Sequence, residues 1–353
     1  MNFFYIFILI LAIFLTFLFT KIIRFFTIKY NIVDKPDESR KIHKVSTPLL
    51  GGLAIFLAFF LLAFFVREKL LIGDLEVSHW LGVFVGAFIL MIGGFLDDKY
   101  NLKPSGQIIF PILAAIAVIL GGVEIEKITN PLGGFIYLNE IKLLGFLVVS
   151  DVLIFLWLMG MMYTTKILDG IDGLVTGVTG IGAFIIFLFT MTTKYYQPDI
   201  GLASLILAGA CLGFLILNWY PAKIFLGEGG SLLLGFLLGT LAIISGGKIA
   251  IALLIMGVPI LDLVWTILRR LKEGKNPFKF ADRKHLHFRL LDSGLSQRKT
   301  VLIFYLFSTL FGLSALFLQS TGKIFALGVL VFIMILIIFG FNYIDSKKNA
   351  KKT

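Results

Sequence analysis

The sequence predicts an all-α polytopic membrane protein of about eleven transmembrane helices, with the N-terminus outside and the C-terminus in the cytoplasm. Of its 353 residues, 58% are hydrophobic and only 15% are charged. Continuous apolar runs recur along the chain, each about twenty residues long and therefore long enough to cross a bilayer as a helix. The runs do not alternate with polar residues, which favours helices over a β-barrel.

The predicted spans cover residues 2–20, 48–66, 80–96, 105–122, 145–165, 173–192, 200–217, 231–245, 249–267, 300–318 and 324–343. An odd number of spans places the two ends on opposite sides of the membrane. With the N-terminus outside, the inner segments hold 25 of the 32 Lys and Arg residues, in agreement with the positive-inside rule. The net charge of +11 then reflects topology and attraction to anionic lipid, and we expect no nucleic acid partner.

We expect one transmembrane domain over residues 1–353, with a cytoplasmic loop at 268–299 and a basic cytoplasmic tail at 344–353. The first apolar run has no basic residue before it and no small-residue cleavage site after it, so we expect a retained helix rather than a signal peptide. The single cysteine, Cys211, excludes a disulfide within the chain. Five charged or glycine-rich clusters all fall on the predicted cytoplasmic side.

The first cluster runs from Asp34 to Gly52 and contains Arg40, Lys41 and His43. Lys and Arg donate hydrogen bonds to phosphate, and glycines let a backbone approach a ligand closely. The alternative is a basic loop that only sets the orientation of the chain in the membrane.

The second cluster is the pair Asp97 and Asp98 at the end of the third span. Adjacent carboxylates repel each other unless a cation lies between them. Mg²⁺ takes oxygen ligands and is commonly shared between one or two carboxylates and substrate phosphates. The alternative is a pair of solvated loop acids.

The third cluster contains Lys166, Asp169 and Asp172, whose spacing of three residues places them on one face if the helix continues. An Asp near the centre of a membrane helix costs on the order of 3 kcal/mol, so we expect this stripe to face a cavity or the membrane boundary. The alternative is a charged helix end in which Lys166 neutralises Asp169.

The fourth cluster, from Asn218 to Ser231, enters the eighth span through a glycine-rich sequence. Backbone N–H groups at a helix N-terminus form a seat for phosphate. Glu228 adds a possible metal ligand, and Phe225 could stack on a base. The segment is not a P-loop because no Lys-Ser or Lys-Thr pair follows the glycines. The alternative is a flexible connector.

The fifth cluster contains Arg283, His285 and His287 in the large loop after the ninth span. A structural zinc site is disfavoured because this loop has no cysteine. Cationic groups that bind phosphate explain the composition better, and an amphipathic surface segment is the alternative.

Taken together and in this order, the five clusters resemble the polyprenyl-phosphate N-acetylhexosamine-1-phosphate transferases, the bacterial glycosyltransferase family 4. These enzymes start cell-envelope glycans by moving a sugar phosphate from a UDP-sugar to a lipid phosphate. The resemblance includes the Asp34-x-Pro entry with its later Gly-Gly pair, the Asp97-Asp98 pair, the Asp169-Gly-x-Asp172-Gly motif, the Asn218 to Ser231 segment and the His285-x-His287 loop.

The resemblance implies a transferase domain that uses Mg²⁺, with Mn²⁺ as the alternative ion, and partners that comprise a UDP-N-acetylhexosamine, undecaprenyl or other polyprenyl phosphate and the lipid bilayer. A homodimer is compatible with it. The active site would face the cytoplasm from the bacterial inner membrane. The implied catalytic residues are Asp97, Asp98, Asp169 and Asp172. The implied metal ligands are Glu228 and Asp98. The implied substrate-binding residues are Arg40, Lys41, His43, Lys166, Asn218, Phe225, Arg283, His285 and His287.

Four residues depart from the family pattern, which usually has Asn at Lys166, Lys at Gln107, Asp at Glu228 and His at Phe288. A gained Lys166 and a lost lysine at Gln107 suggest one positive charge that has moved within a pocket. The alternatives are a catalytically impaired relative that still binds lipid phosphate or nucleotide, and a transporter. Because the loop lacks three consecutive histidines, GlcNAc is the favoured sugar over MurNAc-pentapeptide.

Overall fold

The structure is a computed structural model that describes residues 3–36, 45–73, 75–129, 134–143, 147–192, 196–245, 249–275 and 284–350. The chain is mostly helical, at 76%, which confirms the predicted α class. The helices are α1 (Phe3–Lys29), α2 (Gly52–Phe65), α3 (Arg67–Leu70), α4 (Val77–Tyr100), α5 (Pro104–Gln107), α6 (Ile109–Leu120), α7 (Val149–Leu168), α8 (Leu174–Thr190), α9 (Pro198–Asn218), α10 (Gly227–Ile244), α11 (Ile249–Ile255), α12 (Gly257–Lys272), α13 (Leu286–Asp292), α14 (Gln297–Phe317) and α15 (Ser320–Ala350).

Six short strands form antiparallel pairs at the edges of this helical body. The pairs are β1 (Val33–Asp34) with β2 (Thr47–Pro48), β3 (Lys127–Thr129) with β4 (Phe135–Tyr137), and β5 (Lys142–Leu143) with β6 (Leu147–Val148). The β1–β2 pair lies beside the cavity described below. It joins the start of the first cluster, at Asp34, to the later part of the cluster, at Thr47.

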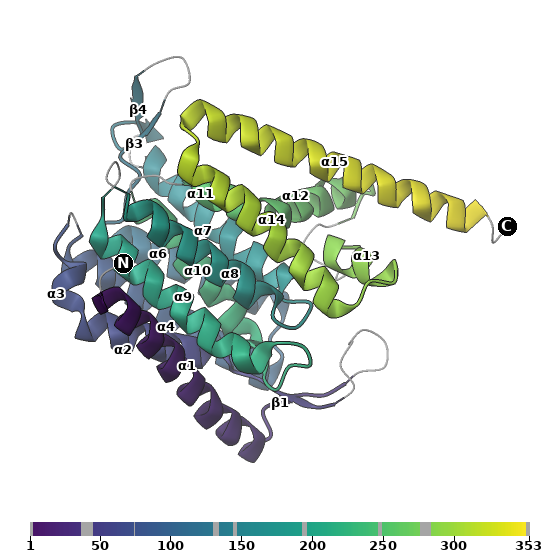
Figure 1. The fold of residues 1–353 in the computed structure, drawn as a ribbon, viewed down its shortest axis with the longest axis horizontal. Helices are drawn as coiled ribbons and strands as arrows, with labels where there is room; N and C mark the ends of the chain where they lie inside the picture. Colours follow the sequence, from purple (N-terminus) through teal and green to yellow (C-terminus); the bar gives the residue numbers. More distant parts are fainter. Residues whose placement is uncertain are drawn as a thin grey trace.

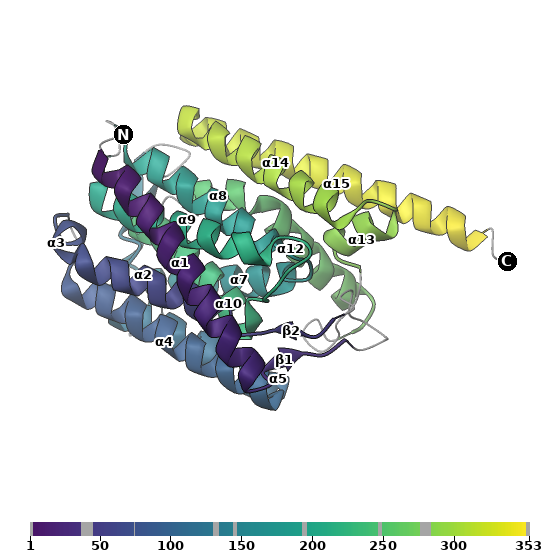
Figure 2. The ribbon, with the colours of Figure 1, turned by 60° about the horizontal axis from the view of Figure 1, so that its bottom comes forward.

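Helices α9 and α10 form the centre of the bundle and are the most buried of the long helices (Figures 1 and 2). Figures 1 and 2 show α1, α2 and α4 on one side of this centre and α14 and α15 on the other. Small residues allow the closest approach, since a side chain at Gly213 would meet the backbone of Ile13 in α1. Small residues at helix contacts are typical of packing in membranes, where backbones approach closely.

All eleven predicted apolar segments are helical in the structure. Within the described residues, seven helices can cross a membrane by length and composition, or eight if α11 and α12 count as one broken span bent by 80°. Shorter apolar helices within 52–65, 104–120 and 174–190 occupy the other three predicted segments. The number of eleven crossings and the orientation of the two ends remain predictions. Helix α15 runs through Ala350, so most of the expected basic tail is helical.

Helix α12 is amphipathic, but its polar face is buried and its apolar face is exposed. Its buried face carries Asp262, Thr266 and Arg270, spaced by four residues, whereas Leu268 and Leu271 on the opposite face are more than half exposed. Residues at i and i+4 share one side of a helix. The polar face of α12 is therefore turned into the protein.

The helical register predicted for the third cluster is wrong beyond Leu168. Helix α7 ends there, and Asp169 and Asp172 lie in the connection to α8. Gly173 has φ +77°, in the left-handed region that glycine adopts without steric cost. The chain therefore turns after Leu168, and Lys166 alone of the three charged residues remains on the helix.

Candidate active site

A cavity of about 1160 Å³ opens where the C-terminal ends of α4 and α7 meet the N-terminal end of α10. Its wall contains six carboxylates contributed by segments far apart in the sequence. They are Asp34, Asp97, Asp98, Asp169, Asp172 and Glu228. Two lysines, Lys35 and Lys99, also line it. The folded chain therefore concentrates negative charge at one end of the bundle.

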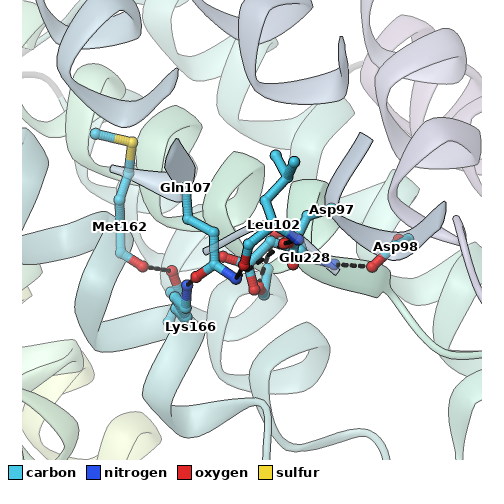
Figure 3. Close-up of polar contacts among 9 residues, drawn as sticks. Asp97, Asp98, Leu102, Gln107, Met162, Lys166 and Glu228 are labelled. Atoms are coloured by element: carbon cyan, nitrogen blue, oxygen red, sulfur yellow. Dashed lines mark hydrogen bonds and ion pairs between the residues drawn. The ribbon is translucent and has the colours of Figure 1, made fainter. Parts of the chain in front are cut away.

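A chain of bonded polar side chains adjoins the cavity (Figure 3). Its members Asp97 and Glu228 line the cavity, whereas Gln107 and Lys166 are not among the lining residues. Lys166 of α7 forms an ion pair with Glu228 of α10 and donates to Gln107 Oε1 at 3.0 Å. Gln107 Nε2 in turn donates to Asp97 Oδ1 at 2.8 Å. The backbone N–H of Leu102 also donates to this oxygen, at 2.9 Å. Lys166 and Gln107 therefore join the carboxylates of α4 and α10.

Asp98 lies at the start of α10 and is bonded on one oxygen only. Its Oδ1 accepts from the backbone N–H of Glu228 at 3.1 Å, as a carboxylate does at a helix N-terminus. Its Oδ2 is buried and has no hydrogen-bond partner among the described residues. A buried carboxylate oxygen without a partner is costly, so this position favours a cation.

The pair of Asp98 and Glu228 fits a divalent metal that uses few protein ligands. The described part of the chain contains no group of three or more His, Cys, Asp or Glu with metal-ligand geometry. Mg²⁺ nevertheless needs only one or two carboxylates because it keeps waters and takes substrate phosphates. Gly227 at φ +75° makes this arrangement possible, since a side chain there would collide with Asp98 Oδ2.

The opposite wall is the loop from Asp169 to Asp172. Asp172 Oδ2 accepts from the backbone N–H of Ala222 at 2.9 Å. Tyr305 of α14 donates its hydroxyl to the carbonyl of Gly173 at 2.5 Å. Contacts with backbone atoms therefore hold this loop from two sides.

Repulsion between carboxylates acts across the cavity. Burial, followed by the charges of Glu228, Asp98 and Asp172, raises the pKa of Asp169 to about 8. The side chain of Asp169 is exposed at the cavity wall, where a bound cation would offset the repulsion from the neighbouring carboxylates.

The comparisons with known proteins agree on one family. Residues 80–246 match the family described as glycosyl transferase family 4. The probable undecaprenyl-phosphate N-acetylglucosaminyl 1-phosphate transferase of Bacillus subtilis is 34% identical over 91% of this chain and 86% of its own length. The chain belongs to glycosyl transferase family 4. This confirms the resemblance found in the five clusters.

Other relatives in family 4 bear names with different sugars. An undecaprenyl-phosphate alpha-N-acetylglucosaminyl 1-phosphate transferase of Thermotoga maritima is 30% identical over 86% of this chain and 87% of its own length. A phospho-N-acetylmuramoyl-pentapeptide-transferase of Halalkalibacterium halodurans is 32% identical over 80% of this chain and 87% of its own length. The shared feature of these names is the transfer of a sugar phosphate.

In this family 4 chain, the two glycine-rich clusters form one backbone unit. The backbone N–H of Gly51 donates to the carbonyl of Phe225 at 2.9 Å, and that of Phe225 donates to the carbonyl of Pro48 at 2.8 Å. Gly52 and Gly230 lie in contact, so that a side chain at either would overlap the other. Phe225 lines the cavity, where it is available to a ligand.

Asn218 is buried, and both the nitrogen and the oxygen of its side-chain amide are bonded to protein. Its side-chain amide donates to the carbonyl of Ile224 at 3.0 Å, and its oxygen accepts from the hydroxyl of Thr176 at 3.0 Å. Asn218 touches the cavity wall, but these two bonds make it the support of the connection between α9 and α10.

The two histidines predicted to bind substrate lie behind the cavity wall. His285 is 6% exposed and His287 is fully buried, whereas Phe288 lines the cavity. Arg40, Lys41, His43 and Arg283, which were predicted on the same grounds, lie outside the described residues.

One polar residue beside these histidines was missed by sequence reasoning. Asp262 of α12 accepts from His285 Nδ1 at 2.8 Å and from the backbone N–H of Leu286 at 3.0 Å. Its signal in the sequence is the spacing of Asp262, Thr266 and Arg270 within an otherwise apolar run. Such a stripe indicates a buried polar face, but it does not reveal the partner.

Proposed function

We propose that this chain transfers N-acetylhexosamine 1-phosphate, with GlcNAc 1-phosphate as the first candidate, from a UDP-sugar to polyprenyl phosphate and releases UMP. The names of the relatives support the sugar phosphate and the lipid phosphate. The donor and the leaving group are our own addition, argued from the chemistry of the cavity.

The convergence of six carboxylates on one cavity carries this proposal. A nucleotide diphosphate would be repelled by such a site unless a cation came with it. Asp98 Oδ2, which has no hydrogen-bond partner in the described part of the chain and lies next to Glu228, is the position best suited to Mg²⁺. When bound, Mg²⁺ would neutralise charge on the diphosphate of the donor.

A second, apolar cavity supports an amphiphilic acceptor. It has a volume of about 280 Å³, is lined by residues that include Leu53, Phe88 and Ile92, and shares Asp98 with the acidic cavity. A lipid phosphate has a hydrocarbon tail and an anionic head, and these need adjoining environments of opposite character.

The proposed reaction is a displacement at the phosphorus that carries the sugar. An oxygen of the lipid phosphate forms the new bond to this phosphorus, the bond to the bridging oxygen breaks, and UMP leaves with that oxygen and its electron pair. A phosphate monoester has a second pKa of about 6 and is mostly dianionic at pH 7. The nucleophile therefore needs little help from a base. Because a carboxylate repels a phosphate dianion, Asp97 would position it through a cation or through the groups that donate to Asp97, which are Gln107 and the backbone N–H of Leu102.

We place the reaction at the cytoplasmic face of a bacterial inner membrane, at the start of cell-envelope glycan synthesis. The excess of Lys and Arg in the segments around the cavity supports this orientation. A cytoplasmic site would also give the cavity access to nucleotide sugars.

The test is UMP release by the purified chain in detergent with undecaprenyl phosphate, Mg²⁺ and a panel of UDP-N-acetylhexosamines. We expect lipid-dependent release with UDP-GlcNAc, a loss in the Asp97→Asn variant, and no change in Asp151→Asn, which alters the far end of α7. Lipid-independent release, or equal release by the Asp97→Asn variant, would contradict the proposal.

The ion pair between Lys166 and Glu228 favours one second candidate, a relative that binds lipid phosphate or nucleotide without turnover. The pair occupies a carboxylate that we assign to the metal. No turnover with any sugar of the panel, by protein that still binds UMP, would establish this second candidate.

A further inference from the structure

The buried group behind the Asp169 to Asp172 loop contains three titratable side chains that the proposed reaction does not use. They come from α12 and from the segment that begins α13. Asp262 is 9% exposed, His285 is 6% exposed and His287 is fully buried. Buried charged or titratable groups are costly, so a group of three at this place needs an explanation.

The first link in the group joins α12 to α13. Asp262 places one carboxylate oxygen 2.8 Å from His285 Nδ1 and the other 3.0 Å from the backbone N of Leu286. His285 must carry a proton on Nδ1 to donate to a carboxylate, so Asp262 fixes both the position and the tautomer of the imidazole. Thr266, one turn along α12, lies 3.4 Å from the same nitrogen.

The second link joins His285 to His287. The two rings are parallel within 2° and their centroids are 5.8 Å apart. His287 also packs against Phe288, with the ring centroids 4.2 Å apart. Neither ring nitrogen of His287 has a hydrogen-bond partner among the described residues. His287 therefore acts by packing.

The third link joins His287 to the cavity wall. A Cβ atom built on Gly170 would lie 2.5 Å from His287 Nε2 and 3.0 Å from Phe288 Cζ. Real Cβ atoms do not approach other atoms so closely, so the imidazole rests directly against the backbone of Gly170. Gly170 separates the two loop carboxylates, Asp169 and Asp172.

We propose that Asp262 is a positioning residue, which acts through His285 and His287 to fix Gly170 and thereby the two carboxylates of the Asp169 to Asp172 loop. This inference rests on the proposed function, because the loop is taken to position groups for the reaction proposed above. The geometric part, a loop held from behind by α12, can be measured on the protein without any turnover.

Hydrogen exchange tests this geometric part. In the loop, the backbone N–H of Asp169 donates to the carbonyl of Thr165 and that of Leu174 to the carbonyl of Ile171. We expect the exchange of amides in residues 169–174 to accelerate about 10-fold or more in the Asp262→Ala variant, because the loop loses its support. Equal exchange in the variant and in the wild type would overturn the proposal.

Ser308→Ala is the matched control. Ser308 is also buried and donates to the carbonyl of Ile255, at the end of α11, at 2.9 Å. The control removes a buried hydrogen bond beside the same broken helix but lies outside the links to Gly170. We expect it to leave exchange in residues 169–174 unchanged. If Ser308→Ala accelerated exchange as much as Asp262→Ala, both variants would act by general destabilisation, and the proposal would be overturned.

Binding and kinetics test the effect on the site, with UMP as the probe. A misplaced loop costs on the order of 10-fold or more in activity. We expect Asp262→Ala to raise the Kd for UMP and the KM for the UDP-sugar about 10-fold while the KM for the lipid stays constant. Asp262→Asn retains one acceptor oxygen and should fall between this variant and the wild type. A rise in both KM values would overturn the assignment to this loop.

A double-mutant cycle between Asp262→Ala and Gly170→Ala completes the test. If both changes act through His287, the double variant should bind UMP as weakly as the worse single variant, because the second change finds the link already broken. Multiplied effects would show independent actions and overturn the proposal. If the wild type binds UMP without turnover, the proposed reaction fails. The cycle still decides whether Asp262 acts on the loop through His287, because it measures UMP binding alone.

Discussion

The two walls of the acidic cavity are built differently. On one side, Asp97 and Glu228 are held by side-chain bonds to Gln107 and Lys166, several of them charged. On the other side, the Asp169 to Asp172 loop is held by the histidine group packed on Gly170, by Tyr305 on the carbonyl of Gly173, and by one bond from the backbone N–H of Ala222 to the carboxylate of Asp172. The first wall is therefore sensitive mainly to charge, and the second mainly to shape. Substitutions that separate charge from shape can test this difference.

The largest effect is expected from Asp98→Asn on the charge-sensitive wall. The substitution keeps an oxygen that can accept from Glu228 N but removes the charge that we assign to the cation. Loss of one charge-stabilising group costs about 10²–10³-fold in kcat. UMP release should fall by this factor with little change in Tm, and Mn²⁺ binding followed by electron paramagnetic resonance should weaken in parallel. Unchanged Mn²⁺ affinity would contradict the assignment.

The next effect comes from a change of shape beside Asp98, at the start of α10. Gly227→Ala places a methyl group against Asp98 Oδ2 at a backbone position with φ +75°. Strain of this kind costs about 1–3 kcal/mol, so both Tm and activity should fall. Gly106→Ala is the matched control, because a Cβ atom at Gly106 meets nothing within 4 Å. Equal losses in the two variants would show that the collision is unimportant.

A smaller effect is expected from moving the positive charge along the charge-sensitive wall. Lys166→Asn and Gln107→Lys alone should each lower UMP release about 10-fold, which corresponds to about 1.4 kcal/mol, the size of one charge-assisted hydrogen bond. The double substitution restores one lysine to this pair of positions, whose side chains are in direct contact in the wild type, and should recover most of the activity. A double variant no more active than the two singles predict would disprove the relocation.

The smallest effect is a pH dependence of stability on the shape-sensitive wall. Burial lowers the pKa of His287 to about 3, from an ordinary value of 6.5. The unfolded state therefore binds the proton first, so this stability is complete above about pH 6.5 and declines as the pH falls toward 3. We expect a loss of about 1 kcal/mol between pH 7.5 and 5.5, measured by thermal unfolding in detergent. Raised carboxyl pKa values, such as that of Asp169, act in the opposite sense. The difference between the wild type and His287→Phe therefore isolates the histidine, and identical pH profiles would contradict the prediction.

The sequence predicted the helices and the carboxylates better than the roles of the neutral side chains. Apolar runs located all eleven helical segments because burial in lipid or protein depends directly on composition. The charged residues Asp97, Asp98, Asp169, Asp172 and Glu228 all line one cavity, since few positions in such a chain tolerate charge. The suspected exchange of charge between Lys166 and Gln107 is supported by their direct contact.

The prediction that failed, the helical register of the third cluster, ignored the turn that Gly173 permits. The substrate-binding roles of His285, His287 and Asn218 stay predictions, but their surroundings depend on partners distant in sequence. His285 is bonded to Asp262 of α12, and both histidines are buried. Asn218 bonds Thr176 with its amide oxygen and Ile224 with its amide nitrogen. Spacing in the sequence identifies polar residues in such cases, while the tertiary partners decide their roles.

The inverted amphipathic character of α12 connects the surroundings of the protein to the candidate site. Val264, Leu268 and Leu271 face outward and are 43%, 55% and 56% exposed, on the side opposite Asp262. These side chains need a hydrocarbon environment, which in the cell is the bilayer and in the laboratory is the micelle. A detergent that fails to cover them would loosen α12 and, through it, the loop at Gly170. The choice of detergent should therefore affect the geometry of the loop at Gly170. Activity that is lost in such a detergent and recovered in nanodiscs would show this effect.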